Sequence, residues 1–361
     1  KYNPPYQCSY FNTRCTFCDL HLIKKQKPGL FFPIMSLLET KSLSIGYHSK
    51  NEHKQLQQDI NVVLNKGEIV SLMGQNGVGK TTFIKSIAGL HTPLSGEVFI
   101  DRNNLNSLSQ SDLSKKISLV LTEKPFSLNM TVVELISIAR HPYSNWLGVL
   151  NEKDKEVIEW AISETHINYI ANDRLYELSD GQLQKVMIAR ALAQETELII
   201  LDEPAAHLDL NNKIEVMLLL RKIASKGKGI LISTHDMQVS TQLSDKLWLF
   251  NFNKGVLEGS PEDLILDGTL EETLYLKNYG YDMIYGTIEV EQPGPEITVR
   301  APQKEKFWIE VALKRNGFKV VMDAPTSISP GKKSGYQLQT KDNLSSHDTI
   351  HQMIESLKKL M

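Results

Sequence analysis

Short apolar runs alternate with helical patterns along most of the chain. Apolar runs bounded by turn residues predict buried strands, and six of them lie at residues 68–73, 97–100, 117–121, 198–201, 229–233 and 246–250. A further strand is expected directly after Met35. Strands separated by helices predict an α/β fold with a largely parallel sheet, in which ligands bind at the carboxyl ends of the strands.

The strand pattern stops between about residues 131 and 193, where helical patterns follow one another. The clearest are 131–140 and 151–165, so we expect a helical subdomain inserted in a nucleotide-binding domain of residues 35–260. A turn-rich boundary follows near Pro261, and we expect residues 261–280 to be a linker.

Residues 281–361 predict a small α+β accessory domain. Strands are expected at 287–291, 296–300, 319–322 and 336–340, and a helix at 305–315 with Gly317 as its C-cap. The apolar face of a last helix would comprise Ile350, Met353, Ile354, Leu357 and Leu360. His347 and His351 are four residues apart, a helical spacing that could hold a metal, but an exposed helix face is the preferred interpretation.

Residues 1–34 are expected to be a non-native or disordered extension, because the first predicted strand opens only after Met35. They contain all three cysteines, Cys8, Cys15 and Cys18. A disulfide framework for the remaining chain is therefore excluded, which fits a reducing cytosol. Together with His21 these cysteines could form a four-ligand zinc site, which we keep as an alternative.

Charge and hydropathy narrow the choice of partners. The 361 residues carry a formal net charge of −2, with a pI near 6.6 and a mean hydropathy of −0.25. No basic field indicates a nucleic-acid partner. No apolar run approaches the roughly 20 residues that a membrane span needs, so any membrane step would require a separate spanning partner.

Residues 74–82 form a phosphate-loop motif, Gly-Gln-Asn-Gly-Val-Gly-Lys-Thr-Thr, between a predicted strand and a predicted helix. Glycines let consecutive backbone N–H groups converge on an anion, and the helix N-terminus adds partial positive charge. Lys80 can reach the β- and γ-phosphates, and the Thr81 hydroxyl can bind Mg²⁺. The expected nucleotide-binding residues here are Gly74, Asn76, Gly77, Gly79, Lys80, Thr81 and Thr82.

Two acids, Asp202 and Glu203, end the apolar run at 198–201. A buried strand that ends beside the phosphate loop would deliver both carboxylates to the bound nucleotide. Asp202 suits Mg²⁺, and Glu203 can orient or polarise the water that attacks the γ-phosphate.

The segment Leu-Ser-Asp-Gly-Gln at 178–182, here called the signature segment, opens a helix. With it, the chain resembles the ATP-binding-cassette (ABC) ATPases, whose signature is Leu-Ser-Gly-Gly-Gln. The order of phosphate loop, signature segment, acid pair and His235 matches that family over residues 39–260. The resemblance implies ATP hydrolysis with ATP and Mg²⁺ as cofactors.

The resemblance also implies roles for individual residues. Tyr47 would stack on the adenine, Asp202 would bind the metal, Glu203 would be the catalytic base, and His235 would contact the γ-phosphate. Two cassettes would pack head to tail as a homodimer. The residues expected to complete the partner's ATP site are Ser179, Asp180, Gly181 and Gln182. Asp209 would lie in the loop that crosses to the second subunit.

Two positions depart from the family pattern. Asp180 replaces the first signature glycine, and either Thr122 or Glu123 stands where the family usually has a glutamine. Glu123 would approach Mg²⁺ or the attacking water as a charge rather than as an amide.

Residues 131–143 are similar to a helix and turn of the ATPases of iron–siderophore, haem and vitamin B12 importers. This implies a peripheral ATPase on the cytoplasmic face of the inner membrane that powers uptake through an integral permease, with a substrate-binding protein as an indirect partner and no nucleic acid. The alternative is a soluble ABC ATPase acting on a ribosome or DNA. A P-loop kinase or GTPase would lack the signature segment.

Overall fold

The computed structural model describes residues 35–48, 53–122, 129–144, 148–206, 208–274, 281–282, 287–288, 293–331, 335–341 and 343–359. The N-terminal extension, including Cys8, Cys15, Cys18 and His21, lies outside the described residues. The alternative of a zinc site therefore stays a prediction.

A six-stranded sheet forms the centre of the first domain, in the order β11-β10-β4-β9-β8-β7. Its strands pair in parallel except β11, which is antiparallel to β10. This confirms the predicted α/β class. The strands are β4 (Ile69–Gly74), β7 (Ile117–Val120), β8 (Leu198–Asp202), β9 (Gly229–Ser233), β10 (Lys246–Asn251) and β11 (Gly255–Gly259).

A second, antiparallel sheet covers helix α1 (Lys80–Ile87) from the other side. The apolar face of α1, with Phe83, Ile84 and Ile87, shares one core cluster with residues of both sheets. The predicted strand at 97–100 belongs to this sheet rather than to the parallel one. Its strands are β1 (Ser36–His48), β2 (His53–Ile60), β3 (Val63–Asn65), β5 (Ser95–Ile100) and β6 (Asn103–Asn104).

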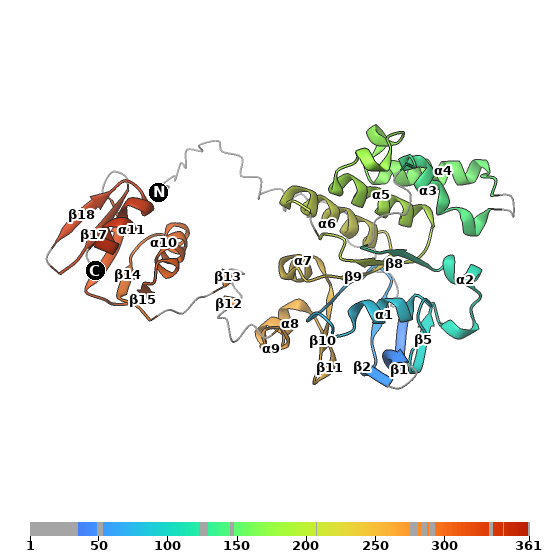
Figure 1. Cartoon of the computed structure of the whole chain (residues 1–361), viewed down its shortest axis with the longest axis horizontal. Coiled ribbons are helices and arrows are strands. Elements are labelled where there is room, and N and C mark those ends of the chain that lie inside the picture. Colours follow the sequence, from blue (N-terminus) through green and yellow to red (C-terminus); the bar gives the residue numbers. More distant parts are fainter. Residues whose placement is uncertain are drawn as a thin grey trace, which may run out of the picture.

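A helical region follows β7 in the chain (Figure 1). It contains α3 (Val132–Ile138), α4 (Glu152–Glu164) and α5 (Asp180–Ala193), whose apolar faces share one core cluster with β8, β9 and α6 (Leu210–Ala224). Two short helices also belong to this domain, α2 (Gln110–Ser114) and α7 (Met237–Leu243).

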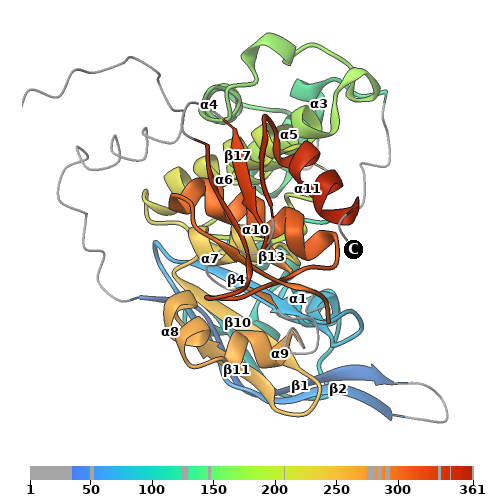
Figure 2. The ribbon, with the colours of Figure 1, turned by 90° about the vertical axis from the view of Figure 1, so that its left-hand side faces the viewer.

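The expected linker at 261–280 is wrong for its first half. Residues there form α8 (Pro261–Leu266) and α9 (Thr269–Thr273), which lie against β10 and β11 (Figures 1 and 2). Leu264 and Leu270 are buried in a cluster with Leu247 and Leu249 of β10. The core of the first domain therefore extends beyond residue 260.

The C-terminal part contains a separate five-stranded sheet in the order β15-β14-β16-β17-β18, with two helices. The elements are β14 (Glu296–Val299), α10 (Gln303–Arg315), β15 (Lys319–Val320), β16 (Thr326–Pro330), β17 (Tyr336–Gln339), β18 (Leu344–His347) and α11 (Ile350–Lys359). This is the expected α+β module. Further upstream, β12 (Tyr281–Asp282) pairs with β13 (Thr287–Ile288).

Details of this module differ from the prediction. Strands β16 and β18 were not predicted, because each contains few apolar residues. His347 ends β18 and bonds Ser345 Oγ at 2.8 Å, whereas His351 lies on α11. The helical spacing expected for the two histidines is therefore wrong. Gly317 does follow the end of α10 in a left-handed conformation, φ 82°.

Because α9 is buried, its apolar residues are expected to contribute to the free energy of unfolding. Leu270 is 0% exposed, whereas Leu266, only four residues earlier, is 85% exposed. We expect Leu270→Ala to lower the free energy of unfolding by about 2–5 kcal/mol and Leu266→Ala by less than about 0.5 kcal/mol. Urea unfolding followed by circular dichroism would measure both, and equal losses would show that α9 is not part of the core.

Candidate nucleotide-binding site

The phosphate loop joins a buried strand to a helix, and three glycines permit the turn. Gly74, Gly77 and Gly79 have φ values of 148°, 80° and 112°. A Cβ at Gly74 would lie 2.5 Å from the carbonyl oxygen of Phe250. The loop therefore depends on glycine both for backbone conformation and for space, and it leads directly into the N-terminus of α1.

Lys80, the first residue of α1, is buried in the mouth of this loop. Its ammonium donates to the backbone oxygens of Gly74 at 2.7 Å and Gln75 at 3.2 Å. Burial lowers the pKa of Lys80, although the nearby charges of Glu203 and Asp202 oppose this shift. The Lys80 ammonium thus lies close to both carboxylates of the acid pair.

The acid pair lies at the carboxyl end of β8. Asp202 is buried, and Glu203 has a left-handed φ of 52°, which is uncommon for a residue with a side chain. The Glu203 N–H donates to the Ser233 carbonyl oxygen on the neighbouring β9 at 2.9 Å. This bond fixes the turn that directs the carboxylate into the pocket.

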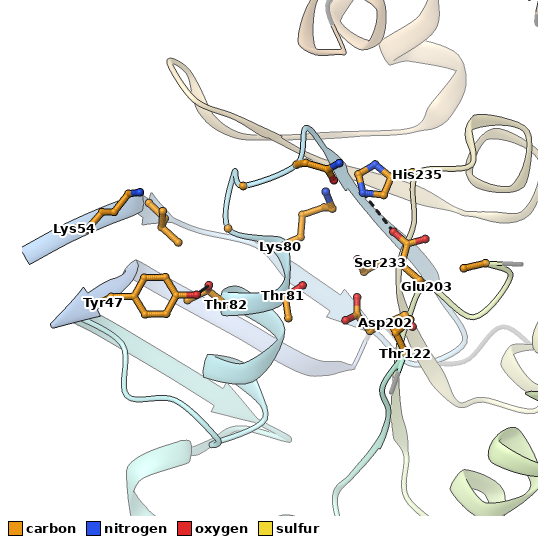
Figure 3. A pocket seen from close by; sticks show the side chains of 15 residues that line it. Tyr47, Lys54, Lys80, Thr81, Thr82, Thr122, Asp202, Glu203, Ser233 and His235 are labelled. Carbon is orange, nitrogen blue, oxygen red and sulfur yellow. Dashed lines mark hydrogen bonds and ion pairs between the residues drawn. The ribbon is translucent and has the colours of Figure 1, made fainter. Parts of the chain in front are cut away.

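Glu203 and His235 face each other across the site (Figure 3). The distance from His235 Nε2 to Glu203 Oε1 is 3.5 Å. Burial raises the pKa of Glu203, and Asp202 raises it further, against a bond from the His235 backbone and the charge of Lys80. Burial and the charge of Lys80 lower the pKa of His235 against the opposing charge of Asp202, which favours the neutral imidazole.

Thr122, at the end of β7, belongs to the same wall of the pocket. Its hydroxyl donates to the Asp202 carbonyl oxygen at 3.1 Å. Glu123, the other candidate for the usual glutamine position, lies outside the described residues. Its approach to a metal or water stays a prediction.

Tyr47 lies at the far end of the pocket, on β1, and its ring is 50% exposed. The phenol oxygen is 2.8 Å from Thr82 Oγ1 of α1. Lys54 and Leu56 of β2 line the pocket as well, and Lys54 pairs with Tyr47 in the sheet. Sequence analysis missed both residues, because only the pairing of β1 with β2 brings them to the site.

The pocket has a volume of about 640 Å³ and collects side chains from widely separated segments. Thr81 and Asp202 approach one another in it (Figure 3). Their hydroxyl and carboxylate oxygens are donors that suit Mg²⁺. Of the predicted site residues it is lined by Tyr47, Asn76, Gly77, Gly79, Lys80, Thr81, Thr82, Thr122, Asp202, Glu203 and His235.

The signature segment does not line this pocket. Ser179 caps α5 and forms a reciprocal capping box with Gln182, so the helix N-terminus is well ordered. Gly181 is buried against Asn212 of α6. Asp209 caps α6 and is likewise absent from the pocket lining.

Arg140, in the segment that is similar to importer ATPases, is 2% exposed and points inward. It donates to Asp154 at 2.9 Å, to Glu195 at 2.7 Å and to the Ala193 carbonyl oxygen at 2.7 Å. Its guanidinium also lies 4.2 Å from the centre of the Tyr143 ring. Arg140 therefore ties the turn after α3 to α4 and α5.

Comparison with known proteins assigns the family. Residues 57–206 match the ABC transporter family, and residues 294–358 match the iron ABC transporter C-terminal domain. An uncharacterised ABC transporter ATP-binding protein of Methanocaldococcus jannaschii is 38% identical over 71% of this chain and 87% of its own length. This chain belongs to the ABC transporter ATP-binding proteins. A petrobactin import ATP-binding protein of Bacillus anthracis is 33% identical over 61% of this chain and 80% of that protein.

A solved structure supports the fold and the chemistry. It is a dimeric ATP-binding cassette in a post-hydrolysis state with ADP and phosphate, with a TM-score of 0.55 and 27% identity over 62% of this chain and 98% of that one. The present cassette is accordingly an ATP-binding ATPase. In the part of the chain that the structure describes, no helix has the length and apolar character to cross a membrane.

The contributions of the Tyr47 ring and of its hydroxyl to ATP binding can be tested separately. If the ring forms a platform for the base, Tyr47→Ala should weaken ATP binding by about five- to 160-fold, because base–aromatic stacking contributes about 1–3 kcal/mol. Tyr47→Phe keeps the ring and removes only the bond to Thr82, so we expect less than about a fivefold loss. Titration with a fluorescent ATP analogue would decide, and equal losses would assign the effect to the hydroxyl.

Proposed function

We propose that this ATPase powers an importer for a metal chelate of the iron–siderophore, haem or cobalamin type. The observation that carries the proposal is the iron ABC transporter C-terminal domain at residues 294–358, which follows the cassette in the same chain. Similarity of the cassette to a petrobactin import ATP-binding protein supports the same class of cargo.

Within the pocket, we assign the roles by position. Lys80, Asn76 and the loop amides would hold the phosphates, and Thr81 with Asp202 would hold Mg²⁺, which neutralises phosphate charge when bound. Glu203 would accept a proton from the attacking water. Its raised pKa makes its carboxylate a better base than an ordinary glutamate. His235, held neutral, would donate a hydrogen bond to the γ-phosphate.

Two copies of the chain would be needed to complete each site. The signature segment and Asp209 do not line the pocket of their own chain. The N-terminus of α5, which carries the positive end of the helix dipole, begins at this segment. In a head-to-tail homodimer this terminus would face the partner's γ-phosphate. ATP would then bring the subunits together, and hydrolysis would release them.

An integral membrane permease would transmit this motion to the cargo. The cassette would therefore act at the cytoplasmic face of the inner membrane, with a substrate-binding protein as an indirect partner and no nucleic acid. The family of the cassette and its petrobactin-importing relative support this arrangement.

Two variants should distinguish the residues needed for ATP binding from those needed for ATP hydrolysis. We expect Lys80→Ala to abolish ATP binding, since the phosphates lose their cation. Glu203→Gln should retain binding but hydrolyse about a thousandfold more slowly, within the range for loss of a general base. Lys85→Ala, at the exposed end of the same helix, is the control. Phosphate release and analogue binding measure the two steps, and normal hydrolysis by Glu203→Gln would contradict the assignment.

The importer itself can be tested with the Glu203→Gln variant purified from its native membranes with Mg-ATP in mild detergent. Mass spectrometry of the co-purifying chains should identify a multi-spanning permease in stoichiometric amount. Ribosomal proteins or nucleic acid in its place would contradict the importer and support a soluble ABC ATPase.

A further inference from the structure

The first turn of α6 contacts both the signature segment and the residues between β9 and α7 that include His235 and Asp236. Figures 1 and 2 show α6 lying between α5, which begins at the signature segment, and α7, which begins just after His235. Neither Asn212 nor Lys213, both in this turn, has a role in the family assignment made above.

Asn212 connects the signature segment to the capping residue of α6. A Cβ at Gly181 would lie 2.5 Å from Asn212 Cγ, so the Asn212 amide packs directly on the Cα of Gly181. The same amide donates to Asp209 Oδ2 at 3.0 Å, while Asp209 Oδ1 accepts the Asn212 backbone N–H at 2.8 Å. Hydrogen bonds to Asp209 thus hold the Asn212 side chain in place, and the side chain in turn packs against Gly181.

Lys213 connects the same turn to the nucleotide pocket. Its ammonium forms an ion pair with Asp236, the residue after His235, and both side chains are only about one-quarter exposed. Asp236 also caps α7 by accepting the Val239 N–H at 3.0 Å. Burial alone would raise the pKa of Asp236, but the bonds from Lys213 and Val239 hold it below its usual range, so the pair stays charged.

A second contact keeps α5 and α6 together as one unit. Lys185, one turn after Gly181, pairs with Glu215, which lies one turn after Asn212. The signature segment therefore cannot shift on α6 without breaking this pair as well as the Gly181 packing. Because packed helices move as units rather than bending freely, a displacement at Asp236 would reach Gly181 through α6.

We propose that Asn212 and Lys213 are positioning residues that hold the signature segment in register with His235 of the same subunit. One chain's own pocket would thereby set the pose of the helix N-terminus that it offers to its partner. This inference rests on the proposed head-to-tail homodimer. Ordering the segment before closure lowers the entropy cost of association, so loosening the link should weaken closure without affecting ATP binding.

The test uses the full chain in the Glu203→Gln background, with dimerisation driven by Mg-ATP. We expect Asn212→Ala and Lys213→Met each to weaken the dimer about tenfold, as measured by sedimentation velocity. Binding of a fluorescent ATP analogue to the monomer should stay within about twofold. Lys213→Arg keeps the charge for Asp236 and should restore dimerisation.

Matched controls lie on the same helix. Lys222→Met removes an ion pair with Glu164 at the far end of α6, and Asn211→Ala alters an exposed neighbour. Neither should change dimerisation.

The double variant Asn212→Ala/Lys213→Met decides whether the two residues act through one link. It should be no weaker than the single variants, because either break already disconnects His235 from Gly181. A loss of about a hundredfold would show independent effects and overturn the proposal, as would single variants that dimerise like the controls. If the Glu203→Gln parent itself does not dimerise with ATP, the result contradicts the proposed head-to-tail homodimer. The positioning role of Asn212 and Lys213, which rests on that homodimer, is then contradicted as well.

Discussion

The structure depends on the phosphate loop, which follows the fully buried parallel strand β4. The backbone N–H groups of this loop must be directed at an anion. β4 pairs with β9 on one side and β10 on the other, so the loop after it has no freedom to move aside. Gly74 passes against Phe250, and Gly79 starts α1 in a left-handed conformation. The packing of α1 between two sheets then fixes the direction of its N-terminus and of Lys80.

Neighbouring strands bring the remaining chemistry to that turn. β8 and β9 run parallel to β4, and therefore the acids after β8 and His235 after β9 reach the same edge of the sheet. Burial at this edge raises the pKa of Glu203 and lowers the pKa of His235, which favours a carboxylate that accepts a proton and a neutral imidazole that donates a hydrogen bond. The sheet thus positions these two groups and also shifts their proton affinities.

Local patterns predicted what depends on local chemistry. The strand, loop and helix around Lys80, the acid pair and the cap at Ser179 all have short-range signals in glycine, charge or apolar periodicity. Contacts that arise from pairing over long distances could not be predicted. Lys54 reaches the pocket only through β1–β2 pairing, Leu270 of α9 is buried against β10, and Asn212 meets Gly181 only when α5 and α6 pack.

The central claim is that each ATP site is completed by a second copy of the chain. A structure of the Glu203→Gln chain with ATP and Mg²⁺ tests it most directly. The account predicts two chains packed head to tail, with the signature segment of one chain within hydrogen-bond distance of the γ-phosphate that is held by Lys80 of the other. A single chain enclosing the nucleotide, or a dimer whose signature segments face solvent, would contradict it.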